Sequence, residues 1–169
     1  MNGDVGIGGG LVVREATRAD LASVIALLAA DAIREVAEVV PAPSGDGGTD
    51  VADDYVRAFA EIEADPSTLL LVGVLDGTVV ATAQLTFLRH LTYRGGLSAQ
   101  VESVRTVAGR RGQGIGTALM RWIEQEARRR GAVRLQLTSN RQRVDAHRFY
   151  ARLGYVASHV GMKRYLGTS

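Results

Sequence analysis

Apolar positions near the start of the chain predict one strand and two helices. The strand covers 11–15, and the helix after it begins with the capping-box-like segment Thr17-Arg18-Ala19-Asp20. The predicted buried face of this helix consists of four residues at helical spacing, namely Leu21, Val24, Ile25 and Leu28. A second helix is predicted over 53–63, and the pair Asp65-Pro66 ends it.

Two strongly apolar runs in the middle of the chain predict a β-hairpin. They cover 68–75 and 78–87, and Asp76-Gly77 lies between them. Asp-Gly between two β-rich runs is a strong short-range signal for a hairpin turn. A further strand is predicted over 99–107, and it leads directly into a glycine-rich turn.

The rest of the pattern predicts a strand–helix–strand crossover. After the glycine-rich turn an amphipathic helix runs to Gly131, and a strand follows over 133–138. We expect this strand to pair in parallel with the one before the turn, through a right-handed connection. A short helix over 146–153 and one or two strands within 155–166 complete the chain. This order predicts a mixed α/β (α+β) fold.

Length and composition favour one domain. The chain has 169 residues, 46% of them hydrophobic, which is enough to form a single core. Residues 1–10 end in a run of glycines and are predicted to be a disordered tail, which leaves 11–169 as the domain. No run approaches the ~18 apolar residues of a membrane helix. The start also lacks a secretory signal pattern, so we expect a cytoplasmic protein without a membrane partner.

Composition and charge narrow the chemistry. The chain has no cysteine, and its three histidines are not spaced as a ligand cluster, so we expect no metal site. Residues 1–100 carry 6 Arg against 14 Asp and Glu, whereas 101–169 carry 14 Lys and Arg against 4 acidic residues. The basic half suits a polyanion such as a phosphorylated cofactor. We expect no nucleic-acid partner, because aromatic residues are few (5%) and the arginines follow no recognition-helix pattern.

The sharpest feature is the turn Arg111-Gly112-Gln113-Gly114-Ile115-Gly116. Its glycines let the backbone approach a ligand, and the unpaired N–H groups of the helix start attract a phosphate or pyrophosphate. A P-loop would need a Lys-Ser/Thr pair, but no lysine occurs before Lys163. The spacing also fails the dinucleotide fingerprint. The alternative reading is that the glycines only permit tight strand-to-helix packing.

With this turn the sequence resembles the GNAT superfamily of acyl-CoA-dependent N-acyltransferases. The turn matches the family signature Arg/Gln-x-x-Gly-x-Gly/Ala, and Phe149-Tyr150-Ala151-Arg152-Leu153-Gly154-Tyr155 is similar to a second family element. The resemblance covers nearly the whole chain. It implies a mostly antiparallel central sheet with a parallel, splayed strand pair, flanked by helices. It also implies acetyl-CoA as co-substrate, a primary amine of a small molecule or peptide as acceptor, and direct attack without an acyl-enzyme.

The resemblance also implies which residues bind the cofactor. The backbone of Val104, Arg105 and Thr106 matches the segment that pairs with the pantetheine arm. The pyrophosphate cradle corresponds to Arg111, Gly112, Gln113, Gly114, Ile115, Gly116 and Thr117. The family often has an asparagine where this chain has Arg143, so Arg143 could bind a cofactor phosphate and Asn140 could supply the missing amide. Val107-Ala108-Gly109 also replaces a common Pro or Asp, so the loop path could differ.

Two catalytic residues follow from the same resemblance. Tyr150 matches a tyrosine that protonates the departing thiolate, and Glu102 matches a base that removes the amine proton directly or through water. Because Val101 and Val104 flank Glu102, we expect partial desolvation to raise its proton affinity. The alternative readings are a core aromatic for Tyr150 and a solvated or ion-paired strand residue for Glu102.

The sequence does not identify the acceptor. We expect its pocket to involve the loop around 41–50, the second helix and the segment 89–94. Dimerisation is common in the family, and the apolar closing strands could support a homodimer. A non-catalytic acyl-CoA-binding regulatory module is the alternative function.

Overall fold

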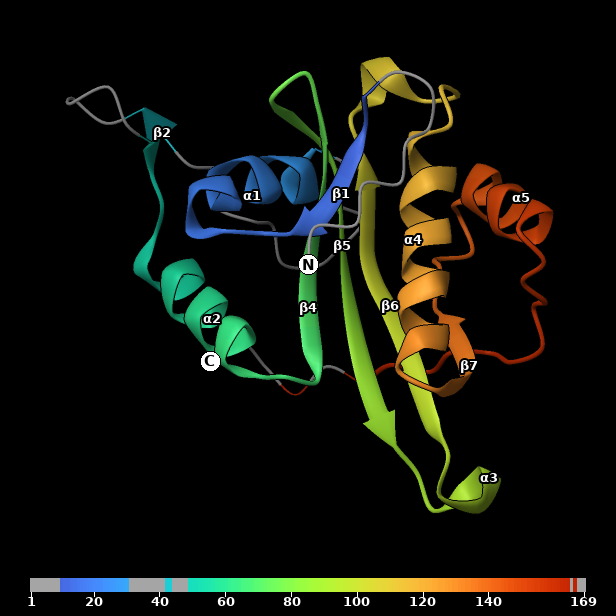
Figure 1. Cartoon of the computed structure of the whole chain (residues 1–169). Helices are drawn as coiled ribbons and strands as arrows, with labels where there is room; N and C mark the ends of the chain where they lie inside the picture. Colours follow the sequence, from blue (N-terminus) through green and yellow to red (C-terminus); the bar gives the residue numbers. More distant parts are fainter. Residues whose placement is uncertain (1–9, 31–41, 44–48, 165, 167–169) are drawn as a thin grey trace.

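The computed structural model describes residues 10–30, 42–43, 49–164 and 166. Its centre is a five-stranded sheet in the order β1-β4-β5-β6-β7 (Figure 1). The strands are β1 (Val12–Glu15), β4 (Thr68–Leu75), β5 (Thr78–Arg89), β6 (Leu97–Thr106) and β7 (Ala132–Leu137). Neighbours pair antiparallel except β6 and β7, which are parallel. The predicted mixed fold with one parallel pair is therefore confirmed.

Helices cover both faces of this sheet (Figure 1). They are α1 (Leu21–Ala29), preceded by the 3-10 turn η1 (Arg18–Asp20), then α2 (Asp53–Ala64), α3 (Thr92–Gly95), α4 (Ile115–Arg129), preceded by the 3-10 turn η2 (Ala108–Arg110), and α5 (Val144–Arg152). A second, two-stranded sheet pairs β2 (Ala42–Pro43) with β3 (Thr49–Asp50). Apart from Gly10, 42–43 and 49–50, the predicted tail 1–10 and loop 41–50 lie outside the described residues.

Alternation along β4 divides the interior into two clusters. Leu69 and Leu71 pack in the larger cluster with α4, whereas Leu70 packs in the smaller one with α1 and α2. Successive strand residues point to opposite faces, so α4 lies on one face and α1 and α2 lie on the other. In α1, Leu27 is buried and the predicted Leu28 is only half-buried, which is a one-residue error in the predicted face.

The predicted hairpin is confirmed at its turn. Asp76 and Gly77 have φ values of 50° and 75°, and Leu75 pairs with Thr78. Two successive positive φ values are what a two-residue turn needs to match the twist of the strands.

β6 and β7 separate after a short paired stretch. Their parallel register runs from Leu97↔Ala132 to Val101↔Leu137 and goes no further. Beyond Val101, β6 continues against β5 with a bulge, because Ser103 and Val104 together face Ala83. Ser103 has φ 54°, an unusual value for a residue with a side chain. The strand pair is therefore splayed at the end that leads into the glycine-rich turn.

The closing segment differs from its prediction. One or two strands were expected within 155–166, but the described part, 155–164 and 166, contains none. Its apolar side chains are exposed: Val156, Val160, Met162 and Leu166. An apolar pattern alone does not form a strand, because a strand also needs a backbone partner, and this segment has no ladder to β7. The homodimer stays a prediction.

A buried carboxylate fixes the start of α1. Asp20 is 7% exposed and accepts two hydrogen bonds from Arg14, of 2.7 and 2.9 Å, and one of 2.8 Å from the Thr17 N–H. The Arg14 hydrogen bond is the main cause that lowers the pKa of Asp20 from 3.8 to about 2. The predicted capping-box-like start is confirmed, although the α-helix itself begins only at Leu21. No helix in the described ranges combines the length and apolar character needed to cross a membrane.

We expect Asp20→Asn to lower the free energy of unfolding by about 2 kcal/mol at pH 7, as measured by urea denaturation. The folded-state pKa lies below the unfolded one, so the carboxylate stabilises the protein above pH ~4, and this contribution disappears as pH falls toward 2. The two proteins should converge in acid. Asp54→Asn, which breaks the exposed pair with Arg57, is the control and should cost less than ~0.5 kcal/mol. Equal losses from both variants would contradict the prediction.

Candidate active site

The glycine-rich turn opens the N-terminus of α4. Gly112 and Gly114 have φ values of 80° and 83°, and Gly114 caps the helix in the left-handed conformation. A Cβ at either glycine would meet nothing within 4 Å. The Ala118 N–H donates to the Gly114 carbonyl over 2.9 Å, so the N–H groups of residues 115–117 have no partner within the helix. Free N–H groups at a helix start, next to two glycines that face open space, fit an anionic group.

Gly116 has a different role from the other two glycines. A Cβ there would lie 3.3 Å from Cζ of Phe149 and 3.7 Å from Cγ2 of Thr106. Thr106 ends β6 and Phe149 belongs to α5, so this glycine allows both to pack against the start of α4. The prediction that all three glycines open the backbone toward a ligand therefore needs correction at Gly116, where the packing alternative applies.

Gly114→Ala and Gly116→Ala should both destabilise the fold, for different reasons. The first places a side chain at positive φ, at a cost of roughly 1–2 kcal/mol. The second crowds the Phe149 ring. We expect Phe149→Leu to couple with Gly116→Ala and to add independently to Gly114→Ala in double-mutant cycles of urea unfolding. Equal coupling in both cycles would contradict these separate roles.

The splayed end of β6 lies just before this turn. Val104, Arg105 and Thr106 are half-buried, and the Val107 N–H donates to the Val80 carbonyl on β5 over 2.9 Å. On the other edge, β7 has already ended its pairing at Val101. The structure thus brings the predicted pantetheine segment and the predicted pyrophosphate turn to the same end of the sheet (Figure 1).

Tyr150 is half-buried in a small aromatic group on α5. Its ring lies edge-on to Phe149 and Tyr155, with centroid distances of 5.1 and 5.8 Å. Burial raises the pKa of the Tyr150 hydroxyl, and the positive charges of Arg105 and Arg143 oppose the rise. These two predicted cofactor residues therefore lie close enough to Tyr150 to affect it. With its pKa above the ordinary value, the hydroxyl stays protonated at neutral pH and can donate.

Glu102 lies on the opposite face of the sheet from α4. Val101 next to it is buried in the α4 cluster, so alternation turns Glu102 the other way, and Glu102 pairs across the strands with Gln84. The side chain is exposed. The predicted desolvation of Glu102 is therefore wrong. Val101 points to the other face of the sheet, and Val104 comes after the bulge at Ser103. The bulge itself was missed, since Glu102-Ser103-Val104 carries no glycine to signal a positive φ.

Comparison with known proteins decides the family. Residues 34–155 match the model of the acetyltransferase (GNAT) family, which is most of the chain. The chain belongs to this family. It is 37% identical over 101 residues to an aminoalkylphosphonate N-acetyltransferase of Salmonella typhimurium strain LT2, and 32% identical over 127 residues to a streptothricin acetyltransferase of Streptomyces lavendulae. These matches cover 60% and 73% of the chain but only 65% and 60% of the relatives, less than two thirds of each.

Solved structures of similar proteins agree with this fold. A protein from Bacillus halodurans C-125 described as a transcriptional regulator is 39% identical, with a TM-score of 0.84, and the match covers 92% of this chain and 99% of that one. A putative acetyltransferase from Agrobacterium tumefaciens str. C58 is 25% identical, with a TM-score of 0.74, over 90% and 98% of the two chains. The GNAT fold thus accounts for the sheet and its splayed parallel pair.

Asn140, expected to supply the missing amide, and Arg143, expected to bind a cofactor phosphate, lie in one local turn. The Asn140 side-chain oxygen accepts the Gln142 N–H over 2.9 Å, and its carbonyl accepts the Arg143 N–H over 3.0 Å. Arg143 is the residue before the first turn of α5. Asn140 therefore holds the loop that presents Arg143 toward Tyr150, and its own contact with the cofactor stays a prediction.

The segment 89–94 begins at the last residue of β5. It leads into α3, in which Tyr93 and Arg94 have positive φ, and Arg134 on β7 donates to the Tyr93 hydroxyl over 2.8 Å. β7 is one edge of the sheet, whereas α2 contacts β4 near the other. The segment also joins β5 to β6 at the end opposite the glycine-rich turn (Figure 1). The expectation that it lines the acceptor pocket together with α2 stays a prediction.

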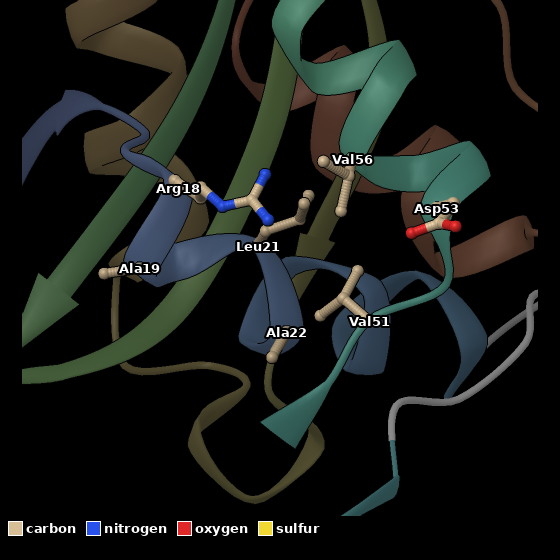
Figure 2. A pocket seen from close by; sticks show the side chains of 7 residues that line it. All are labelled: Arg18, Ala19, Leu21, Ala22, Val51, Asp53 and Val56. Atoms are coloured by element: carbon tan, nitrogen blue, oxygen red, sulfur yellow. The ribbon is translucent and has the colours of Figure 1, made fainter. Parts of the chain in front are cut away.

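A hollow of about 410 Å³ lies between the starts of α1 and α2 (Figure 2). Leu21, Val51 and Val56 contribute apolar lining, and Arg18 and Asp53 contribute charged groups. None of the residues predicted for catalysis or cofactor binding contributes to it. The part of the chain that the structure describes also contains no group of three or more His, Cys, Asp or Glu residues that could hold a metal ion.

Proposed function

We propose that this chain transfers the acetyl group of acetyl-CoA to a primary amine of a small molecule or peptide, by direct attack in a ternary complex. The observation that carries the proposal is the junction of an open glycine turn, the splayed end of β6 and the half-buried Tyr150. Membership of the GNAT family supports the reaction class.

The cofactor residues of the proposal surround that junction. Backbone N–H groups from Gly112 to Thr117 bind the pyrophosphate, helped by the dipole of the 15-residue helix α4, and Arg111 contributes its charge. Backbone groups of Val104, Arg105 and Thr106 pair with the pantetheine arm along the edge that β7 leaves open. Arg143, with Arg105, adds positive charge beside Tyr150. The cradle fits because a Cβ at Gly112 or Gly114 would meet only open space.

The chemical step divides between the two faces of the sheet. Glu102 accepts the proton that the amine must lose before its nitrogen can attack the thioester carbon. Backbone N–H groups near Val104 stabilise the negative charge that develops on the carbonyl oxygen. The nitrogen attacks the thioester carbon to form the C–N bond and then loses its second proton to solvent. The C–S bond breaks as the Tyr150 hydroxyl donates its proton to the departing sulfur, and the tyrosinate regains a proton from solvent. No residue of the chain is acylated.

The relatives suggest a small acceptor. One is named for an aminoalkylphosphonate and the other for streptothricin, and both names describe molecules that receive an acetyl group. We therefore propose a small-molecule amine ahead of a peptide. The hollow between α1 and α2 lies on the same face as Glu102, so it is available to the distal part of a longer acceptor.

The test has two stages. Calorimetry should detect binding of both acetyl-CoA and free CoA, and bound ligand should raise the melting temperature because it favours the native state. Thiol release with a panel of primary amines should then reveal turnover. Absence of CoA binding would overturn the whole proposal.

A second function is favoured by one comparison. The Bacillus halodurans structure, 39% identical, is described as a transcriptional regulator. A non-catalytic acyl-CoA-binding regulatory module would bind CoA in the calorimeter and release no thiol with any amine. The same two measurements therefore separate the two functions.

A further inference from the structure

A row of polar side chains crosses the face of the sheet that carries Glu102. The row has one residue on each of four strands, paired in register: Thr68 on β4, Thr86 on β5, Gln100 on β6 and Gln136 on β7. Their neighbours Leu69, Leu85, Val101 and Leu137 pack with α4, so the polar row points to the opposite face. A central sheet position is usually apolar, and four polar residues in one row are therefore unusual.

The two glutamines at the end of this row form an amide pair. Gln136 Nε2 donates to Gln100 Oε1 over 2.7 Å. Each amide has two N–H donors and a carbonyl with two acceptor sites, so one shared bond leaves most of this capacity unused. The described residues provide no further hydrogen bond to either amide. Both side chains, and Thr86 beside them, are only half-buried and can be reached from solvent.

The pair has a fixed position relative to the proposed base. Gln100 and Glu102 are two residues apart on regularly paired β6, so their side chains lie on the same face about 7 Å apart along the strand. Gln84 stands opposite Glu102, as Thr86 stands opposite Gln100. A molecule with its amine at Glu102 would place an atom some 6–7 Å away at the amide pair.

The unused capacity indicates the group that fits there. An N–H of Gln100 needs an acceptor and the carbonyl of Gln136 needs a donor, and one hydroxyl can satisfy both. A carboxylate can only accept and would leave the Gln136 carbonyl unpaired. An alkyl group would leave the remaining donors and acceptors of both amides unpaired.

Resting on the proposed acetyltransferase function, we propose that Gln100 and Gln136 select the acceptor. It is a hydroxylated primary amine, of the amino-alcohol or amino-sugar class, whose hydroxyl lies about 6–7 Å from the reacting nitrogen. The two glutamines are specificity-determining residues, and they take no part in proton transfer.

Three ring amines test this selection at saturating acetyl-CoA. They are trans-4-(aminomethyl)cyclohexanol, cyclohexylmethylamine and trans-4-(aminomethyl)cyclohexanecarboxylate, which differ only in the group opposite the aminomethyl substituent. We expect kcat/KM for the hydroxyl compound to exceed the other two by about tenfold, mainly through KM. Gln100→Leu with Gln136→Leu should abolish the preference and leave the KM for acetyl-CoA unchanged. Gln125→Leu, at an exposed position on α4, should keep it.

Three outcomes would overturn the inference. They are equal turnover of the three amines, preference for the carboxylate, or a preference that survives the double leucine variant. Gln100→Met with Gln136→Met provides a second pair of similar volume if the leucine variant unfolds. Thiol release from none of a wide amine panel, despite CoA binding, would instead overturn the proposed function and this inference with it.

Discussion

Tyr150→Phe is expected to lower kcat by about 100-fold or more and to leave the affinity for CoA nearly unchanged, because general-acid catalysis commonly contributes 10²–10⁴-fold. The ring stays in place between Phe149 and Tyr155, so only the hydroxyl is removed. Steady-state kinetics of thiol release and calorimetry with CoA measure the two quantities. A large loss in kcat with constant affinity is the signature of an interaction made only in the transition state.

Tyr155→Phe provides a matched control. Tyr155 is also half-buried, its centroid lies 5.8 Å from that of Tyr150, and burial also raises the pKa of its hydroxyl. It has no role in the proposed step, so its loss should change kcat by no more than about threefold, the size of a small packing effect. Equal losses from both variants would mean that the aromatic group acts through packing, and an unchanged rate in Tyr150→Phe would remove that residue from the mechanism.

The pH dependence of kcat should also show that Tyr150 acts as a proton donor. A proton donor must be protonated, and burial holds the pKa of Tyr150 above its ordinary value of 10.0 despite Arg105 and Arg143. The rate should therefore not fall from this group as pH rises through 7 to 9. Arg105→Gln or Arg143→Gln removes an opposing charge, so it should move the alkaline fall to still higher pH.

Local sequence signals were sufficient wherever one short segment determines the structure. The dipeptide Asp76-Gly77 predicts its own turn, and helical spacing of apolar residues predicts the buried face of α4. The strand–helix–strand order predicts the parallel return to β7. The splayed end of β6 was expected only from the family resemblance, and its register confirms it.

Several of the misses depend on contacts between distant segments. The role of Gly116 depends on Phe149, 33 positions later, and the bulge at Ser103 depends on the register of β5. The amide pair of Gln100 and Gln136 could have been suspected, because a polar residue in the middle of two neighbouring predicted strands is a signal, but only the register joins the two.

Glu102→Gln is expected to lower kcat/KM by about 100-fold at neutral pH for an ordinary primary amine, which is almost fully protonated there. The amide has the same shape but cannot take the proton. The Glu102 side chain is exposed and pairs across the strands with Gln84, so the substitution should leave the melting temperature nearly unchanged. Glu63→Gln, an exposed residue of α2, is the control and should keep full activity.

The acceptor's own basicity separates a base from a binding residue. An amine that is already neutral needs no proton acceptor before it attacks, so the deficit of Glu102→Gln should shrink as pH rises toward the amine's pKa. It should also shrink for a weakly basic amine at fixed pH. A deficit that stayed constant across pH and across amines would show that Glu102 holds the ammonium group by charge, and the proton would then have to leave through water. The exposure of Glu102 makes this comparison decisive, because burial supplies no separate reason for a changed rate.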